Sequence, residues 1–335
     1  MPLFKSFIAK LMAVLVCLSL FFGVFVYGLS QPASAVPGEP VSIIVKPGMS
    51  AAEIGTLLHE NGLIKNITVF RLIVHAQRLE SSLQAGEYTF TRNMKMPAII
   101  SMIAKGEIAY QQFTVPEGLT INEVARLLAE KKVADADKFS KAATEFPLPD
   151  YVVFSDQASF KLEGYLFPDT YRVPRGATEE TIVRTMVGQF DKQLTPELRA
   201  KAKEQGLSIR DTIILASLVE KEARYADERL IVAGVFLKRL KEGMPLQSCA
   251  TIQFILGYPK PELTVKDTEI VSPYNTYLNA GLPPGPIASP GLSSIKAVLS
   301  PAMTEYLYFV ADKNGKHHFS RTYSEHLAAI DRIGS

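Results

Sequence analysis

An uncharged stretch near the N-terminus constrains this chain more than any other feature. It runs from Leu11 to Ser30 and reads LMAVLVCLSLFFGVFVYGLS. A helix of about twenty apolar residues is long enough to cross the hydrocarbon core of a bilayer. Lys5 and Lys10 precede the stretch, whereas no lysine or arginine follows it closely. This asymmetry predicts that the N-terminus is cytoplasmic and that the chain after about residue 37 lies on the outer face of the membrane.

Two fates of this stretch remain open from the sequence. Ala33 to Ala35 has the small-x-small form of a signal-peptidase site, and cleavage there would release the chain. The stretch is longer than the usual apolar core of a signal peptide, which favours an uncleaved anchor. Cys17 follows Val16, whereas lipoprotein processing requires a small residue before the cysteine, so a lipid anchor is not expected.

The charge and cysteine content exclude several classes of function. The net charge is +2, so the chain lacks the basic footprint of a nucleic-acid-binding protein. Cys249 is the one cysteine after the apolar stretch, which excludes an internal disulfide and a cysteine-based metal site. The histidines lack metal-ligand spacing, and His317 with His318 is interpreted as part of a turn after Asn314 and Gly315. We therefore expect neither a metal nor a cofactor.

An internal repeat organises the next part of the chain. Val45–Leu58 (VKPGMSAAEIGTLL) matches Val115–Leu128 (VPEGLTINEVARLL). In each copy a β-branched run leads into a Pro/Gly turn and an amphipathic helix with a capping box: Ser50 with Glu53, and Thr120 with Glu123. Gly86–Ile108 forms another strand–turn–helix unit between the copies. Units this small bury little surface alone, so we expect them to pack together as one adaptor region.

The first copy, followed by Asn61–Ile64 (NGLI), resembles the peptidoglycan-binding LysM module. This resemblance implies contact with sugar. A plain spacer that holds the rest of the chain away from the membrane explains the same region, and the sequence leaves both interpretations open.

A long apolar run from Thr212 to Leu240 contains the most informative residue, Glu222. The run is predicted to be one helix, because no glycine or proline occurs before Gly234. At about 100° per residue, Glu222 falls on the apolar stripe, while Glu220 points the opposite way, toward water. A carboxyl group in an apolar setting is harder to ionise, and a protonated carboxyl is what general-acid cleavage of a glycosidic bond requires.

Glu222 also has a purely structural interpretation. A buried ion pair with Arg229 or Lys238 would place a carboxyl group at the same position on the stripe. Helix geometry alone does not decide between an acid catalyst and a salt-bridged residue.

Several motifs together resemble the MltG (YceG-like) endolytic murein transglycosylase family. They are EKEA after an apolar helix, RLKEGMPLQS, SPYNTYLNAGLPPGPIASPGLSSIKAVLSP and YLYFVAD…HHFSRTYSEH. The resemblance covers nearly the whole exported chain. It implies an α+β fold with an N-terminal transmembrane helix, small LysM-like strand–helix units and a lysozyme-like catalytic domain. The expected boundaries are residues 1–36 for the tail, anchor and linker, 41–158 for the LysM-like adaptor region, and 159–335 for the catalytic domain.

The resemblance also implies a reaction, endolytic cleavage of the β-1,4 bond between N-acetylmuramic acid and N-acetylglucosamine with formation of a 1,6-anhydro end. Glu222 aligns with the family's essential glutamate and would act first as acid and then as base. Alternatives are a muramidase that hydrolyses the same bond with a second carboxylate, and a non-catalytic wall-binding scaffold. Expected partners are peptidoglycan glycan strands, the cytoplasmic membrane through Leu11–Ser30, and cell-wall synthases, with a role in terminating or trimming nascent strands.

Five further residues are candidate substrate contacts. Tyr274 and Asn275 stand in YNTY, which is similar to a Tyr-Asn element that lines the cleft of lytic transglycosylases. Gln247 follows a turn (GMPL), and Tyr165 belongs to a strand-like aromatic alternation with Phe167 and Tyr171, so each also has a structural explanation as a turn or core residue. Glu220 is the fifth candidate, as the acid two residues before Glu222.

Overall fold

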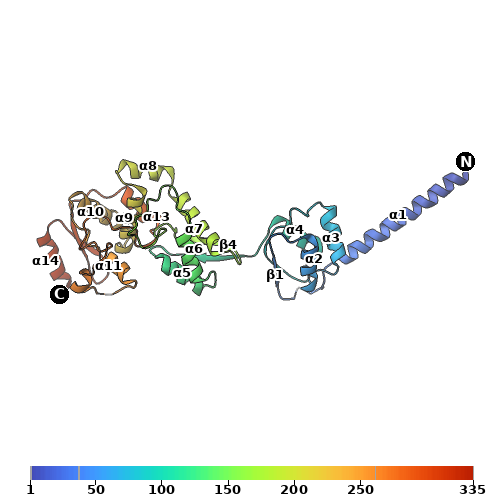
Figure 1. Ribbon diagram of the computed structural model, residues 1–335, viewed down its shortest axis with the longest axis horizontal. Helices are drawn as coiled ribbons and strands as arrows, with labels where there is room; N and C mark the ends of the chain where they lie inside the picture. The colour runs from blue at the N-terminus through green and yellow to red at the C-terminus, as the bar shows by residue number, and fades with distance from the viewer. Residues whose placement is uncertain (1, 37, 261, 335) are drawn as a thin grey trace. The chain divides into compact units, whose positions relative to one another are not determined.

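The computed structural model describes residues 2–36, 38–260 and 262–334, and Figure 1 labels most of its elements. The chain divides into two compact units. The first runs from the N-terminus to Gln111 and includes Arg172–Gly176. The second contains Gln112–Tyr171 and Ala177–Ser335.

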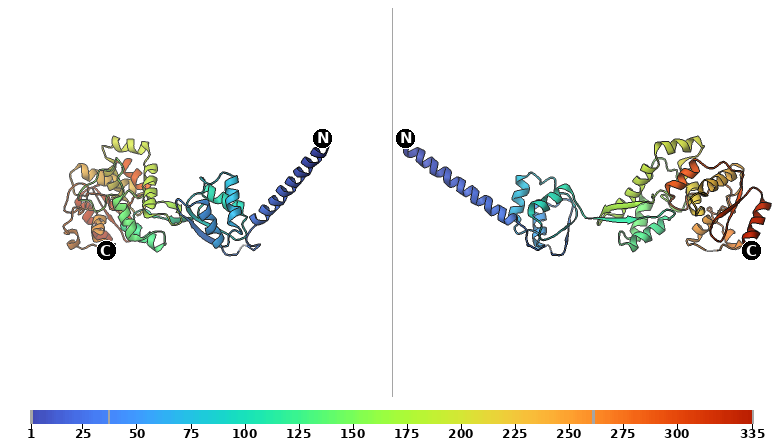
Figure 2. Two further views of the ribbon diagram at one scale, coloured as in Figure 1. Left: turned by 45° about the vertical axis from the view of Figure 1, so that its right-hand side comes forward. Right: turned by 180° about the vertical axis from the view of Figure 1, so that it is seen from behind.

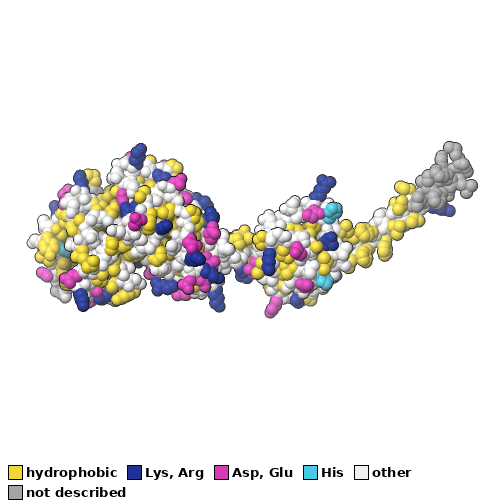
Figure 3. Space-filling model, viewed as in Figure 1, with side chains coloured by type: hydrophobic (Ala, Val, Ile, Leu, Met, Phe, Trp, Pro, Cys, Tyr) yellow, Lys and Arg dark blue, Asp and Glu magenta, His cyan; other side chains and the backbone are white. Residues whose placement is uncertain are grey.

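The first helix, α1 (Pro2–Ser30), is the apolar stretch expected from the sequence. Its segment Met12–Ser30 has a mean hydropathy of 2.4 and is largely exposed, although Ser30 at its end is buried. Figure 3 shows hydrophobic side chains along this segment. The side chains of Lys5 and Leu11 lie outside the described residues. Length and composition fit a membrane anchor, and they fit a signal sequence equally well.

A β–α–α–β arrangement follows α1 in the first unit (Figure 1). Its elements are β1 (Val41–Val45), α2 (Ala51–Glu60), α3 (Ile67–Ala76), β2 (Gly86–Phe90) and a further helix, α4 (Met96–Lys105). β1 and β2 pair antiparallel, with Ile43 opposite Tyr88. Helices α2 and α3 pack on this two-stranded sheet, because residues of their apolar faces, including Leu58 and Phe70, are fully buried in one core.

The second unit is mostly helical. Its elements are β3 (Tyr110–Thr114), α5 (Ile121–Glu130), α6 (Ala136–Glu145), β4 (Thr170–Pro174), α7 (Glu179–Gln193), α8 (Pro196–Glu204), α9 (Ile209–Glu222), α10 (Arg229–Lys241), α11 (Cys249–Leu256), α12 (Val265–Thr268), α13 (Leu292–Leu299), β5 (Tyr308–Ala311), β6 (His317–Ser320) and α14 (Tyr323–Gly334). β3 pairs with β4, and β5 pairs with β6. The first residues of β4 belong to the second unit and its last residues to the first unit. In the C-terminal part, α14 packs on the β5–β6 hairpin (Figure 2).

Both predicted capping boxes are confirmed. Ser50 accepts a hydrogen bond from the Glu53 amide (3.3 Å) and donates its own N–H to the Glu53 carboxylate (2.7 Å). Thr120 and Glu123 make the same reciprocal pair at 3.2 and 2.8 Å. Each box satisfies amide groups that the first turn of a helix leaves unpaired, which explains why α2 and α5 begin where the sequence indicates.

The expectation of one adaptor region over residues 41–158 is wrong, because the two repeat copies lie in different units. Residues 112–158 belong with the C-terminal part of the chain rather than with β1–α4. Backbone hydrogen bonds explain this: Gly118 N–H donates to Ser289 O, and Ser289 N–H donates to Leu119 O, both at 2.8 Å. The second copy is therefore built into the larger unit through contacts that its own sequence does not reveal.

The core of the second unit is α9. Every residue from Thr212 to Val219 is buried, and α9 packs against α13 and α10. A helix that is buried on all sides has no solvent face. The sequence predicted one apolar face on this helix, whereas the structure buries all of its faces.

Candidate active site

The single long helix predicted over residues 212–240 is wrong in one informative respect. α9 ends at Glu222, Ala223 leaves the helix with φ −83° and ψ 97°, and α10 starts only at Arg229. The intervening segment has no glycine or proline, so nothing local marks the break. Glu222 is consequently the last residue of a buried helix rather than a residue in the middle of one.

Two groups from the start of α11 hold the Glu222 carboxyl group. Ser248 Oγ donates a hydrogen bond to Glu222 Oε1 at 2.5 Å, and the Ala250 N–H lies 3.4 Å from the same oxygen. Ser248 is itself 1% exposed, and its N–H donates to Thr276 Oγ1 at 3.0 Å. The orientation of Glu222 is thereby tied to the N-terminal turn of α11 and to the loop that contains Thr276.

Neither of the proposed ion-pair partners contacts Glu222. Arg229 Nη2 lies 3.6 Å from Glu220 Oε1, and Lys238 Nζ lies 3.1 Å from Glu305 Oε2. Among the residues that the structure describes, Glu222 takes part in no ion pair. The salt-bridged interpretation of Glu222 therefore finds no support.

The expectation that Glu220 faces water is also wrong. Its side chain is 7% exposed, because α9 has protein on both faces. One carboxylate oxygen, Oε2, accepts hydrogen bonds from Gly291 N–H (3.0 Å) and Ser294 Oγ (2.8 Å), at the start of α13. Glu220 thus joins α9 to α13 and to Arg229, and its side chain is occupied by these contacts.

A cavity of about 680 Å³ lies within the second unit, and Glu222 itself is not among the residues that line it. Ala250, whose N–H points to the Glu222 carboxyl group, forms part of its wall, as does Lys221. Another part of the lining comes from α5, which contributes Asn122 and Arg126. Its lining combines polar and apolar side chains in about equal parts, a mixture that suits a sugar chain.

The YNTY loop contributes to the cavity through its first tyrosine. Tyr274 lines the cavity, and its hydroxyl accepts a hydrogen bond from Ser159 N–H at 3.2 Å. Asn275 is fully buried, and its amide donates to Thr268 O (2.9 Å) and Ile270 O (2.7 Å). Both amide hydrogens of Asn275 are therefore used inside the loop, which fits a role in shaping the loop.

Two other sequence candidates lie elsewhere. Gln247 is exposed and adopts φ +50°, and its N–H donates to Thr276 O at 3.1 Å. Tyr165 is 2% exposed and packs edge-on against Phe190, with ring centroids 5.2 Å apart. Tyr165 is thus a core residue and not a sugar platform, and the strand expected from its alternation with Phe167 begins only at Thr170, as β4.

Sequence reasoning missed the buried carboxyl group in the cavity lining, that of Glu163. It is 1% exposed, and Ile121 N–H, at the start of α5, donates to its two oxygens at 3.2 and 3.3 Å. Burial raises the pKa of Glu163 to about 8, so the group is mostly protonated at neutral pH. The sequence feature that could have indicated this buried carboxyl group is the position of Glu163 between Leu162 and Gly164, in a segment rich in aromatic residues.

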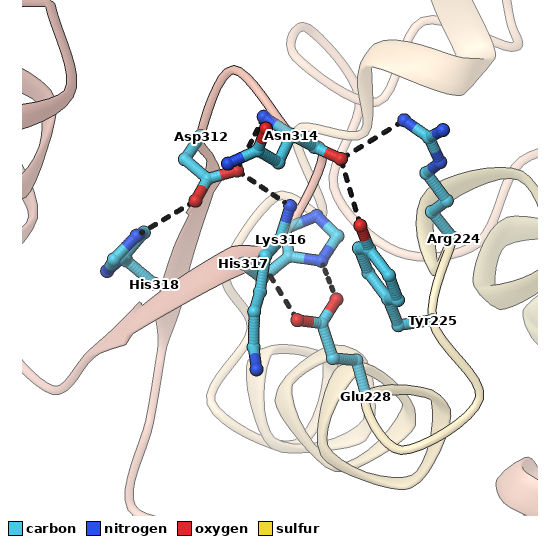
Figure 4. Close-up of polar contacts among 8 residues, drawn as sticks. All are labelled: Arg224, Tyr225, Glu228, Asp312, Asn314, Lys316, His317 and His318. Atoms are coloured by element: carbon cyan, nitrogen blue, oxygen red, sulfur yellow. Dashed lines mark hydrogen bonds and ion pairs between the residues drawn. The ribbon is translucent and has the colours of Figure 1, made fainter.

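The β5–β6 hairpin lies against the segment between α9 and α10 (Figure 4). His317 and His318 are strand residues of β6, not part of the turn as expected, and the turn runs through Asp312–Lys316. The side chain of His317 is buried against Glu228, whereas that of His318 is half exposed, with Nε2 3.7 Å from Asp312 Oδ2. Among the described residues, no cluster of three His, Cys, Asp or Glu side chains could hold a metal ion.

The fold and site define an α+β protein in which a buried helix ends at Glu222, whose carboxyl group forms no ion pair among the described residues and contacts Ala250 in the wall of a cavity. The chain belongs to the YceG-like family, whose model matches residues 43–332. It is 36% identical over 327 residues to a protein named endolytic murein transglycosylase from Bacillus subtilis (strain 168), covering 92% of this chain and 90% of that one.

Two further comparisons agree. A protein of the same name from Streptococcus pneumoniae (strain D39) is 31% identical over 354 residues; these cover 96% of this chain but only 64% of the longer relative. A crystal structure of a yceG-like protein from Listeria monocytogenes superposes with a TM-score of 0.60 at 32% identity, over 87% of this chain and 99% of that one.

Proposed function

We propose that the chain is an endolytic peptidoglycan lytic transglycosylase with Glu222 as its catalytic residue. The similarity to relatives named endolytic murein transglycosylase supports this activity. The observation that carries the assignment of Glu222 is its carboxyl group, which contacts Ser248 and the cavity-lining residue Ala250 and has no cationic partner among the described residues. A wall-binding scaffold has no need for a carboxyl group in that setting.

The first step is acid catalysis. Protonated Glu222 donates its proton to the oxygen of the β-1,4 bond between N-acetylmuramic acid and N-acetylglucosamine, and the C–O bond at the muramic acid C1 breaks. Positive charge grows at C1, and the free N-acetylglucosamine end leaves. Ser248, which donates to one oxygen of Glu222, stabilises the carboxylate that this step creates.

The second step uses the same carboxylate as base. Glu222 removes the proton from the C6 hydroxyl of muramic acid, and O6 bonds to C1 to close the 1,6-anhydro ring. This internal nucleophile replaces water and gains from its high effective concentration. The proton returns to Glu222, so the enzyme is regenerated without a second carboxylate.

Of the carboxyl groups in the cavity lining, those of Glu123, Asp137 and Glu163, the buried Glu163 is the least suited to serve as the base of a hydrolase. A hydrolase of the usual kind requires a second carboxylate about 5–10 Å from the acid. Glu163 is the buried carboxyl group in the same cavity lining, and its pKa of about 8 keeps it mostly neutral below that pH. A neutral carboxylic acid is a poor base, so Glu163 is ill suited to activate water near neutral pH.

Mass spectrometry of digested glycan strands tests the proposed activity. Purified strands incubated with the full-length protein should yield internal fragments that end in 1,6-anhydro-N-acetylmuramic acid. Reducing ends in place of anhydro ends would instead establish a muramidase, and uncut strands would leave the scaffold interpretation.

We further propose that residues 11–30 remain as a single-pass anchor that holds the enzyme on the outer face of the cytoplasmic membrane. This placement brings the cavity to strands as synthases extend them, and it suits a role in terminating or trimming nascent strands. The uncharged segment Met12–Ser30 supports an anchor. Mature protein that begins at Val36 and fractionates without membranes would contradict it.

The first unit is proposed as a LysM-like peptidoglycan-binding module, because its β–α–α–β order and antiparallel ribbon suit a small binding domain. Retention of residues 41–107 on purified sacculi above that of an unrelated control would support binding. Equal retention would favour a spacer.

A further inference from the structure

The segment between α9 and α10 begins directly after Glu222. Residues 224–227 are exposed and contain no glycine or proline. Helix-forming residues in such a segment have no intrinsic reason to stop at Glu222. Ser248 and Ala250 hold the Glu222 carboxyl group on one side, and the backbone position of Glu222 depends in addition on what fixes the segment that follows it.

The β5–β6 hairpin supplies that fixation at the far end of the segment. His317 N–H donates to Glu228 Oε1 at 2.9 Å, and His317 Nδ1 lies 2.7 Å from Glu228 Oε2 (Figure 4). Both side chains are 4% exposed. Two charge-assisted hydrogen bonds between buried groups fix both distance and orientation, so Glu228 is held to a strand that is 89 residues away in the sequence.

The same hairpin also contacts the near end of the segment. Asn314 O, in the hairpin turn, accepts hydrogen bonds from Arg224 Nη1 at 3.1 Å and from Tyr225 Oη at 3.2 Å (Figure 4). Gly315 approaches Arg224 so closely that an added Cβ would lie 3.0 Å from Arg224 Cδ. The hairpin therefore contacts the segment on both sides of its exposed middle.

We infer that the Glu228–His317 pair positions Glu222 for catalysis by clamping the segment that ends α9. The inference rests on the proposed function and assigns a role to residues outside the cavity lining. Neither Glu228 nor His317 belongs to the cavity lining. Misplacement of a reacting group by about 1 Å costs on the order of 10²-fold in rate, so loss of the clamp should act on kcat more than on KM.

Three single variants of the full-length protein test the clamp by steady-state kinetics on purified glycan strands. His317→Ala removes the side-chain partner of Glu228 and should lower kcat by about 10–100-fold with KM little changed. His317→Asn places an amide N–H near the position of Nδ1 and should restore most of the rate. His318→Ala alters the adjacent, half-exposed histidine of the same strand and serves as the matched control with unchanged kcat.

Hydrogen exchange provides a readout that does not depend on activity. Amides of residues 223–228 should exchange faster in His317→Ala than in His318→Ala, because the segment opens locally. If the wild-type protein makes no anhydro ends, the proposed function fails, while this comparison still tests the clamp. Faster exchange with an unchanged kcat would overturn the positioning role.

Misfolding is controlled by a second variant. Glu228→Gln keeps the shape of the side chain and one accepting oxygen but removes the charge. It should show the same pattern of lower kcat with similar KM, at a temperature where melting curves show folded protein. Equal kcat in His317→Ala, Glu228→Gln and the control would refute the inference. A loss of kcat that is fully explained by a smaller fraction of folded protein would refute it as well.

Discussion

Replacing Glu222 with glutamine is expected to abolish strand cleavage while the protein keeps its melting temperature. Loss of general-acid catalysis alone costs about 10²–10⁴-fold in rate. The same group also serves as base in the proposed reaction, so the loss should lie at the upper end of that range or beyond it. The amide oxygen of glutamine can still accept the hydrogen bond from Ser248, which is why folding should be nearly unaffected.

Glu220→Gln is the contrasting variant, because Glu220 lies only two residues before Glu222 but has a structural role. Its carboxylate accepts from Gly291 N–H and Ser294 Oγ and pairs with Arg229. Weakening a buried hydrogen-bonded charge costs about 1–3 kcal/mol in stability, so this variant should have a lower melting temperature. At temperatures where it is folded, it should still cleave glycan strands.

Both glutamine variants would be assayed on the same strands, with anhydro ends counted and melting curves recorded. Near-wild-type turnover in Glu222→Gln would end the proposed mechanism. An equal loss of rate in both folded variants would mean that the two acids act together.

The second large effect is expected from Gly164→Ala, which should destabilise the second unit. Gly164 adopts φ +85°, and an added Cβ would lie 2.6 Å from Pro286 Cβ and 3.0 Å from Ile213 Cγ2. The left-handed backbone costs an alanine about 1–2 kcal/mol, and overpacking adds about 1–3 kcal/mol. Neither the proline ring nor a residue of α9 can move away easily.

Gly188→Ala provides the matched control for this measurement. Gly188 lies inside α7, and an added Cβ there meets nothing within 4 Å. Alanine favours a helix interior by about 0.5–1 kcal/mol over glycine, so this variant should melt at the same temperature as the wild type or slightly higher. In a unit of this size, each kcal/mol shifts the melting temperature by about 2–4 °C, so Gly164→Ala should melt roughly 4–20 °C lower. A melting temperature for Gly164→Ala equal to that of Gly188→Ala would show that the loop around Pro286 adapts.

Local sequence signals predicted the parts of the fold that local chemistry determines. The capping boxes at Ser50 and Thr120 fixed the starts of α2 and α5, because the groups that satisfy each first turn lie within three residues. The apolar stretch predicted α1 in the same way. Thr178 caps α7 by the same local chemistry, because its side chain accepts a hydrogen bond from Thr181 N–H.

The features that were missed depend on distant residues. The end of α9 at Glu222 coincides with contacts from a hairpin far along the chain, so helix propensity continued the helix to Leu240. Glu220 was placed toward water because helix geometry assumes one solvent face, whereas α13 covers it. Tyr165 was taken for a sugar contact because an aromatic residue in a core and one in a cleft have the same local sequence pattern.

The hydrogen bonds that join the second repeat copy to Ser289 have a consequence for any attempt to isolate the catalytic part. A chain shortened to residues 159–335 would lose α5, and with it the side chains of Asn122 and Arg126 from the cavity lining. It would also leave Glu163 without the Ile121 N–H that donates to it. The smallest fragment able to cut glycan strands should therefore begin before β3. The second repeat copy is part of the catalytic unit, as is the helix that ends in Glu222.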